Sequence, residues 1–158
     1  MGHKYAVVPA TLEHVEQMLP HVRKADIDEV YAASGKPIEE VLPTGVRCST
    51  HVWTGTVDGQ PACIFGVVPA SVMSGIGVPW MLGTDLVEEH ATAFLKRNKR
   101  YVKQMLEAYN YLVNYVDDRN VKAIAWLKWL GFTVQEPQPF GALRLPFRRF
   151  EMMRTEHV

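Results

Sequence analysis

The first third of the chain carries its apolar residues at helical spacing. A helix is predicted over residues 12–19, because apolar side chains recur there every three or four positions and Thr11 is placed to cap the first turn. A second helix is predicted over residues 21–33, ended by Gly35. Residues 37–42 are expected to add one further helical turn.

Short apolar runs, typical of β-strands, occur at the start and in the middle of the chain. Strands are predicted over residues 4–9, 50–57, 61–68 and 78–85. The dipeptide Asp58–Gly59 favours a tight turn between the second and third of these strands, which are therefore expected to form a hairpin. Residues 70–77 are small and rich in glycine and serine, which indicates a loop.

The longest periodic segment, residues 86–109, predicts one long helix. Its apolar stripe is interrupted only by Asn98, and its opposite face carries a basic cluster at Lys96–Arg100. We expect the stripe to pack on a sheet and the basic face to point outward.

The segment Tyr111–Phe132 predicts a strand, a polar break, a short helix and the start of another strand. Asn120 is placed to cap the helix Val121–Leu130 with its side chain, and Gly131 supplies the left-handed residue that ends it. After this segment, two prolines and a glycine over residues 137–141 predict a loop. Two strand pieces are then expected, over residues 143–145 and 147–152.

Composition and charge exclude several classes of protein. The 17 basic and 17 acidic residues give no net charge, so no nucleic-acid partner is expected. No apolar run approaches about 20 residues, so no membrane span is expected, and the first residues lack the pattern of a signal peptide. Cys48 and Cys63 are expected to be small core residues of a protein in the reducing cytoplasm. The histidines show no metal-ligand spacing.

The segment Tyr111–Phe132 resembles the C-terminal half of GNAT-type N-acetyltransferases. The shared pattern is a strand followed by Asn120, Ala123, Ile124, Leu130, Gly131 and Phe132. The resemblance implies an α+β fold over residues 4–153, with a mixed, mostly antiparallel sheet, a splay between its fourth and fifth strands, and helices on both faces. An ordinary strand–helix–strand unit with a capped helix explains the same residues.

In that family acetyl-CoA inserts its pantetheine arm into the gap between the splayed strands, so the resemblance implies acetyl-CoA as cofactor. The implied contacts are the backbone of Leu82, Gly83 and Thr84, and Asn120 at the edge of the gap. The family's glycine-rich pyrophosphate loop is missing, because no glycine follows Gly83 before the end of the predicted long helix. Arg97 in the basic cluster is the nearest substitute, although charge runs of this kind are usually a solvated face, and that interpretation is preferred for this cluster.

An acyltransferase of this type also needs a proton donor for the departing thiolate. The tyrosine that often follows the helix pattern in the family is replaced by Leu127, which leaves Tyr115 or Tyr101 for this role. Each tyrosine also suits a buried aromatic position with a polar tip. The acceptor amine, whether a small molecule or a protein, is not specified by any motif.

The acidic residues near the predicted gap are candidate general bases. Glu29 and Asp26 lie on the second helix, which borders the acceptor pocket in GNAT folds, and Asp85 ends the predicted fourth strand. Structural roles explain the same residues. Asp85 has the spacing of a capping box with Glu88. Asp26 and Glu29 can pair with Arg23 or Lys24 on the same helix.

The outer thirds of the chain are also similar to a family of small tailed-phage proteins, some of which are called internal core protein A. The shared segments are RKADIDEV, VWTGTVDGQPACIFGV, PWMLGTD and NVKAIAWLKWLGF. This similarity implies a phage or prophage origin and a place in the host cytoplasm or the virion.

Two functions therefore stay open. One is an acyl-CoA-dependent N-acyltransferase. The other is a catalytically inactive GNAT-fold phage protein that acts in virion assembly or binds a host protein. The apolar helix Val121–Leu130 indicates a covering surface, either a second copy of the chain or a virion or host protein.

Overall fold

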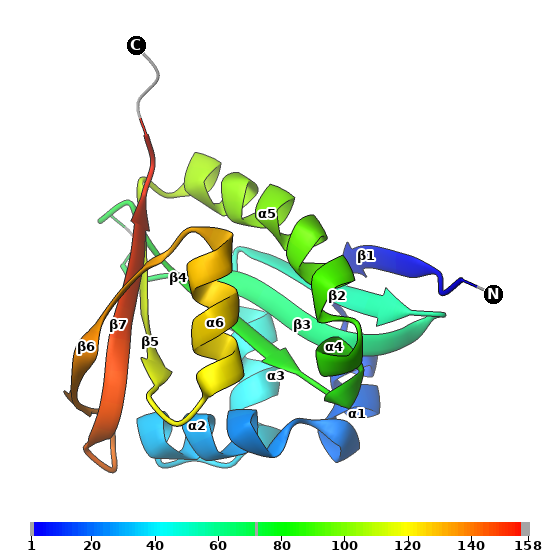
Figure 1. The fold of residues 1–158 in the computed structure, drawn as a ribbon, viewed down its shortest axis with the longest axis horizontal. Helices are drawn as coiled ribbons and strands as arrows, with labels where there is room; N and C mark the ends of the chain where they lie inside the picture. Colours follow the sequence, from blue (N-terminus) through cyan, green and yellow to red (C-terminus); the bar gives the residue numbers. More distant parts are fainter. Residues whose placement is uncertain (1, 72, 156–158) are drawn as a thin grey trace.

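The computed structural model describes residues 2–71 and 73–155, which build one seven-stranded sheet with helices on both faces (Figure 1). The strands are β1 (Tyr5–Pro9), β2 (His51–Val57), β3 (Gln60–Pro69), β4 (Ile76–Gly83), β5 (Tyr111–Asp117), β6 (Thr133–Phe140) and β7 (Leu145–Met153). Their order is β1-β2-β3-β4-β5-β7-β6. Neighbouring strands run antiparallel except β4 and β5, which run parallel. The predicted mixed α+β fold is confirmed.

The splay lies between β4 and β5. These strands pair only at their first residues, Ile76 with Tyr111 and Gly77 with Leu112. Each strand is held on its other side, β4 by β3 and β5 by β7, along its whole length. The sheet therefore consists of two halves that meet at one end of β4 and β5 and diverge toward the other (Figure 1). The predicted gap between the fourth and fifth strands is confirmed.

The helices form two layers around this sheet. They are α1 (Leu12–Met18), α2 (Lys24–Ser34), α3 (Ile38–Cys48), α4 (Asp85–Glu89), α5 (Ala91–Ala108) and α6 (Val121–Leu130), with a short 3₁₀ turn at Leu19–His21. In Figure 1, α5 and α6 cover one face, α1 and α3 lie behind the other, and α2 crosses the end where β4 and β5 diverge. Two apolar clusters result, one under each helical layer. The helix Val121–Leu130 has the bounds that its sequence predicts.

The prediction of one long helix over residues 86–109 is wrong, because the helix is interrupted at His90. This residue has φ −116° and ψ 27°, and it separates α4 from α5. Its ring is held by the hydroxyl of Tyr5 at 2.7 Å, a contact with the far end of the chain that no local pattern indicates. Thr84, not Asp85, caps α4: its Oγ1 accepts from the backbone N–H of Leu86. Asp85 therefore lies in the first turn of α4 and does not end β4.

The single turn predicted over residues 37–42 is a full helix, α3. Pro43 lies inside it and does not end it, and the helix continues to Cys48. Ile38, Leu42 and Val46 pack on the sheet along one side of α3, and this apolar contact stabilises the helix beyond the proline. Cys48 is exposed at the end of α3, so its predicted place in the core is wrong, whereas Cys63 is buried as expected.

The loop predicted over residues 137–141 is also wrong, because β6 extends from Thr133 to Phe140. β6 is the edge strand and pairs only with β7. A proline has no N–H for the ladder, but on an edge strand the missing donor can face solvent. The register is irregular between Val134 and Pro137, which accommodates the first proline. The last strand is the continuous β7, not two pieces.

Candidate functional site at the strand gap

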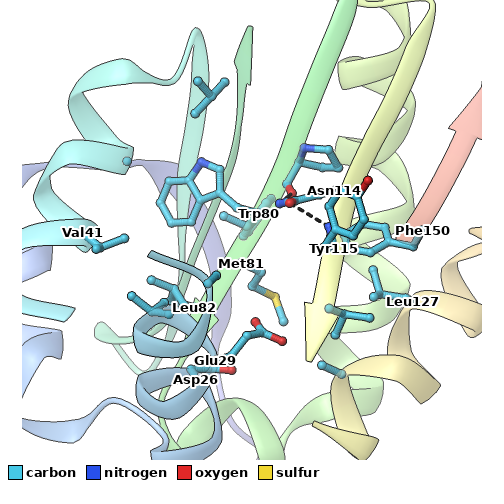
Figure 2. Close-up of a pocket in the computed structure, with 18 of the residues that line it drawn as sticks. Asp26, Glu29, Val41, Trp80, Met81, Leu82, Asn114, Tyr115, Leu127 and Phe150 are labelled. Atoms are coloured by element: carbon cyan, nitrogen blue, oxygen red, sulfur yellow. Dashed lines mark hydrogen bonds between the residues drawn. The ribbon is translucent and has the colours of Figure 1, made fainter. Parts of the chain in front are cut away.

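A cavity of about 630 Å³ occupies the gap between β4 and β5 (Figure 2). Its edges are residues 79–82 of β4 and residues 114–116 of β5. Side chains of α2 and α3 line it on one face of the sheet, and side chains of α5 and α6 line it on the other. The walls are mostly apolar. The cavity therefore connects the two helical layers through the sheet.

Asn114 links the two strands at the narrow end of the gap. Its Nδ2 donates to the carbonyl oxygen of Pro79 on β4 at 2.8 Å, and its Oδ1 accepts from the backbone N–H of Tyr115 (Figure 2). The first of these bonds joins β5 to β4 just beyond the last ladder pair of the two strands, Gly77 with Leu112. Asn114 carries no signal in the sequence, because a polar residue within a strand pattern does not indicate a cross-strand contact.

Carboxylates from α2 bridge the open end of the gap. Asp26 Oδ2 accepts from the backbone N–H of Gly83 at 2.9 Å, and Glu29 Oε1 accepts from the backbone N–H of Asp117 at 2.8 Å. Gly83 is the last residue of β4, and Asp117 is the last residue of β5. Asn120 Nδ2 lies between the two acids and donates to Asp26 at 3.2 Å and to Glu29 at 3.4 Å. Thus α2 satisfies strand-end donors that no neighbouring strand reaches.

Asn120 does not cap α6 in the predicted manner. It holds the N-cap position, but its side chain makes no capping bond, because its amide group is directed to Asp26 and Glu29. The predicted stop at Gly131 is confirmed, with φ 104°. Asn120 is almost fully buried, so its position between α2 and α6 is fixed by the tertiary structure.

Arg23 connects α2 to the helices on the opposite face. Its side chain is 5% exposed, and its guanidinium donates to Asp26 at 2.9 Å and to Glu88 of α4 at 2.7 Å. It also lies over the ring of Trp126 on α6, 5.0 Å from the ring centroid. Lys122 of α6 adds a further ion pair, because its Nζ donates to Oε2 of Glu88 at 2.8 Å. These ion pairs hold α2, α4 and α6 together.

Arg23 also explains why α2 starts at Lys24 and not at His21. The backbone N–H of Arg23 donates to the carbonyl oxygen of Gly83 at 2.9 Å, and Val22 forms a bridge with Thr84. The backbone before α2 is therefore extended and paired with the end of β4. The helical spacing of residues 21–33 did not reveal this long-range pairing.

Glu29 is the carboxyl group whose pKa lies near neutral pH, so both of its protonation states are populated there. Loss of solvation in the apolar surroundings raises the pKa of Glu29 to about 7, and the backbone N–H of Asp117 only partly opposes this effect. The nearby carboxylate of Asp26 raises it further. The pKa of Asp26 is itself raised by burial, against the lowering effect of Arg23. Glu29 lines the cavity, and within the described part of the chain no hydrogen bond involves its Oε2.

We expect Glu29→Gln to stabilise the fold at alkaline pH. The folded state raises the pKa of Glu29 from 4.5 to about 7, so it binds a proton that the unfolded chain releases between these values. Wild-type stability therefore falls as pH rises through this window, and the uncharged glutamine avoids the loss. The difference should approach, and not exceed, about 3 kcal/mol at pH 8 and vanish below pH 4.5. Urea unfolding of both proteins at pH 4 and 8 measures it; parallel pH dependences would contradict the shift.

The predicted site residues fall into two groups. Glu29, Tyr115 and Leu82 line the cavity, and the ring of Tyr115 stacks on Phe140 with centroids 3.9 Å apart. Asn120 borders the cavity through its bond to Glu29.

Other predicted residues lie elsewhere. Asp85 is exposed in α4. Arg97 is exposed on α5, lies over the ring of Tyr5 at 4.9 Å and donates to the carbonyl oxygen of Ala93. Thr84 caps α4. The gap therefore brings together the candidates from α2, β4, β5 and α6, but not those from α4 and α5.

The end of β4 does not fit a pyrophosphate held by backbone N–H groups. The N–H of Gly83 donates to Asp26, and the N–H of Thr84 donates to the carbonyl oxygen of Ala62. The next helix, α4, is only five residues long and carries the carboxylates of Asp85, Glu88 and Glu89. Negative side chains disfavour a phosphate at this point. The apolar cavity suits an uncharged chain, but the residues at its β4 end do not suit the charged end of a CoA.

The described residues contain neither a metal-binding cluster nor a membrane-spanning helix. Within residues 2–71 and 73–155, His, Cys, Asp and Glu side chains nowhere form a group of three that could hold a metal ion. Over the same residues, every helix is too short or too polar to cross a membrane.

Comparison with known proteins supports the fold at low sequence identity. Neither a family model nor a curated protein sequence matches this chain. Among solved structures, a ribosomal-protein-alanine N-acetyltransferase from Brucella melitensis has a TM-score of 0.70 at 13% identity, covering 94% of this chain and 99% of that chain. An aminoglycoside acetyltransferase in complex with coenzyme A has a TM-score of 0.68 at 12% identity, covering 96% and 95%.

The structure of yncA from Salmonella typhimurium with its cofactor acetyl-CoA has a TM-score of 0.66 at 13% identity, covering 97% of this chain and 95% of that chain. These neighbours establish that the chain has the fold of GNAT acetyltransferases. At such identities they carry no residue roles, so the chemistry of the gap rests on its own side chains.

Proposed function

We propose that the protein is a GNAT-like N-acyltransferase, formed by a domain of residues 4–153, which transfers an acyl group from acetyl-CoA to an amine. The observation that carries this proposal is the cavity between β4 and β5, with the Glu29 carboxyl group in its wall. A gap that crosses the sheet lets an acyl donor enter from one helical layer and an acceptor from the other. The fold, shared with solved structures that contain coenzyme A or acetyl-CoA, supports the choice of donor.

Glu29 is the proposed general base. An amine attacks only after it has lost its proton, and a carboxylate with a pKa of about 7 accepts that proton efficiently near neutral pH. Oε1 is held by the backbone of Asp117 and by Asn120, which leaves Oε2 to face the acceptor. CoA would supply the activated acyl thioester. Tyr115, at the β5 edge of the cavity, is the proposed proton donor for the thiolate, because Leu127 has no ionisable group.

The apolar walls select the uncharged part of the donor. Leu82 of β4, Val116 of β5 and Leu127 of α6 are among the residues that surround the cavity. A pantetheine arm is largely aliphatic with two amides, so such walls suit it. The phosphates would lie outside the cavity and be held by side chains such as Arg97, since the backbone N–H groups of Gly83 and Thr84 already donate within the protein.

A second candidate function is favoured by the ion pairs at the open end of the gap. Arg23, Glu88 and Lys122 join α2, α4 and α6 where the family places the cofactor's charged end. We propose as the alternative a catalytically inactive protein of phage origin that kept the fold and acts in virion assembly or binds a host protein, in the host cytoplasm or the virion. The exposed Val121 and Trp129 of α6 would then contact the partner or a second copy.

Titration calorimetry with acetyl-CoA and desulfo-CoA tests the first function against the second. We expect micromolar affinity that persists at physiological salt. The variant Arg97→Gln is expected to weaken binding of the complete cofactor and to leave pantetheine binding unchanged, if the basic face of α5 holds the phosphates. An absence of binding at millimolar acetyl-CoA would eliminate the acyltransferase and leave the alternative, which pull-down from a phage-infected host would then address.

A further inference from the structure

Asn98 is a buried polar residue in an apolar stripe. It lies on α5, is 6% exposed, and takes a place in the stripe that also holds Phe94, Val102 and Met105. This stripe packs against the sheet, so a leucine at position 98 would match its neighbours. Asn98 also lines the cavity between β4 and β5.

The carboxamide of Asn98 is only half satisfied. Its Nδ2 lies 3.8 Å from Sδ of Met81 on β4. A thioether can accept a hydrogen bond but cannot donate one, so this contact directs the NH₂ group to Met81 and the oxygen away from it. Within residues 2–71 and 73–155, no hydrogen bond reaches Oδ1, which is buried. A buried carbonyl without a donor destabilises a fold, so an asparagine here has no structural benefit over leucine.

We propose that Oδ1 of Asn98 binds an amide N–H of the ligand that fills the cavity, and that this ligand is an elongated, mostly apolar chain. The proposal rests on the proposed function in one respect, since the arm of an acyl-CoA is such a chain. A neutral donor is required because the cavity walls on this face are apolar: Leu95, Val102, Met105, Leu127 and Leu130. An ammonium group would lose its hydration there without a carboxylate beside it.

Two matched thioesters test the proposal. S-hexanoyl-N-acetylcysteamine carries one amide N–H, and its ester analogue replaces this N–H by an oxygen atom and keeps the length of the chain. We expect the wild-type protein to bind the amide about ten-fold more tightly than the ester, because the ester leaves Oδ1 without a donor. In Asn98→Leu the two compounds should bind with equal affinity. The control Leu95→Met, which changes the same wall without changing its polarity, should keep the preference.

Thermal unfolding separates this role from a structural one. Asn98→Leu should raise the Tm by about 2–4 °C, since it removes an unpaired buried carbonyl. A lower Tm would show that Asn98 supports the fold and would overturn the proposal. Equal binding of amide and ester by the wild type, a preference that persists in Asn98→Leu, or no binding of either compound would also overturn it. Amide preference without any binding or turnover of acetyl-CoA would reject the proposed function and leave the role of Asn98 intact.

Discussion

Replacing Glu29 by glutamine is expected to lower the rate of acyl transfer by about 100-fold or more at pH 8. The glutamine keeps the size of the side chain and can still accept from the backbone N–H of Asp117, but it cannot take a proton from the acceptor amine. Affinity for the acyl donor should change little. The loss cannot be assigned to unfolding, because the same substitution is expected to stabilise the fold at this pH.

The pH dependence of turnover provides the sharper measurement. Wild-type turnover should rise as the pH increases through about 7, because Glu29 must be ionised to act as a base. This rise should be absent in Glu29→Gln. Glu40→Gln is the matched control, since Glu40 also lines the cavity but is exposed on α3 and pairs with Lys36. If Glu29→Gln keeps the rate within a factor of three of wild type, another group is the base.

Replacing Arg23 by methionine is expected to destabilise the fold by about 3–5 kcal/mol, because it leaves the buried carboxyl group of Asp26 without its cation. Glu88 loses a partner as well, although its bond to Lys122 remains. Arg23→Lys should restore only part of the stability, since an ammonium cannot contact Asp26 and Glu88 in the geometry of a guanidinium or stack on Trp126 in the same way.

Urea unfolding at pH 7 measures the effect of Arg23. Lys24→Met is the matched control one residue further along the chain, because Lys24 is 89% exposed in a surface pair with Asp28. That control should change the stability by less than about 1 kcal/mol. A similar small change in Arg23→Met would show that the ion pairs of Asp26 and Glu88 are not required to hold α2, α4 and α6 together.

Local signals were sufficient for the elements that local physics controls. The helix Val121–Leu130 was predicted from its apolar run and from Gly131, whose positive φ ends a helix wherever it is packed. The hairpin at Asp58–Gly59 was predicted in the same way, and both residues have positive φ. The order of elements and the resemblance to GNAT acetyltransferases predicted the mixed sheet and its gap, which the structure confirms.

Elements whose form depends on distant neighbours were predicted poorly. Pro137 and Pro139 lie in a strand only because β6 is at the sheet edge, and edge position is a property of the assembled sheet. His90, at which the helix is interrupted, is hydrogen-bonded to Tyr5, which lies 85 positions earlier in the chain. The side-chain amide of Asn120 does not cap α6, because it donates to the carboxylates of Asp26 and Glu29 on α2.

The sequence by itself determined which candidate side chains are present for chemistry: Glu29, Asp26 and Asp85 among the acids, Tyr115 and Tyr101 among the tyrosines, and Asn98 as the one interruption of an apolar stripe. Only the tertiary structure decided which of these side chains share a cavity and how their surroundings shift a pKa. A carboxyl group has a pKa near 4.5 in any unfolded chain, and it reaches about 7 at Glu29 because the fold removes its solvation and places Asp26 beside it. Desolvation and charge proximity depend on distances between segments, and the order of residues does not contain those distances.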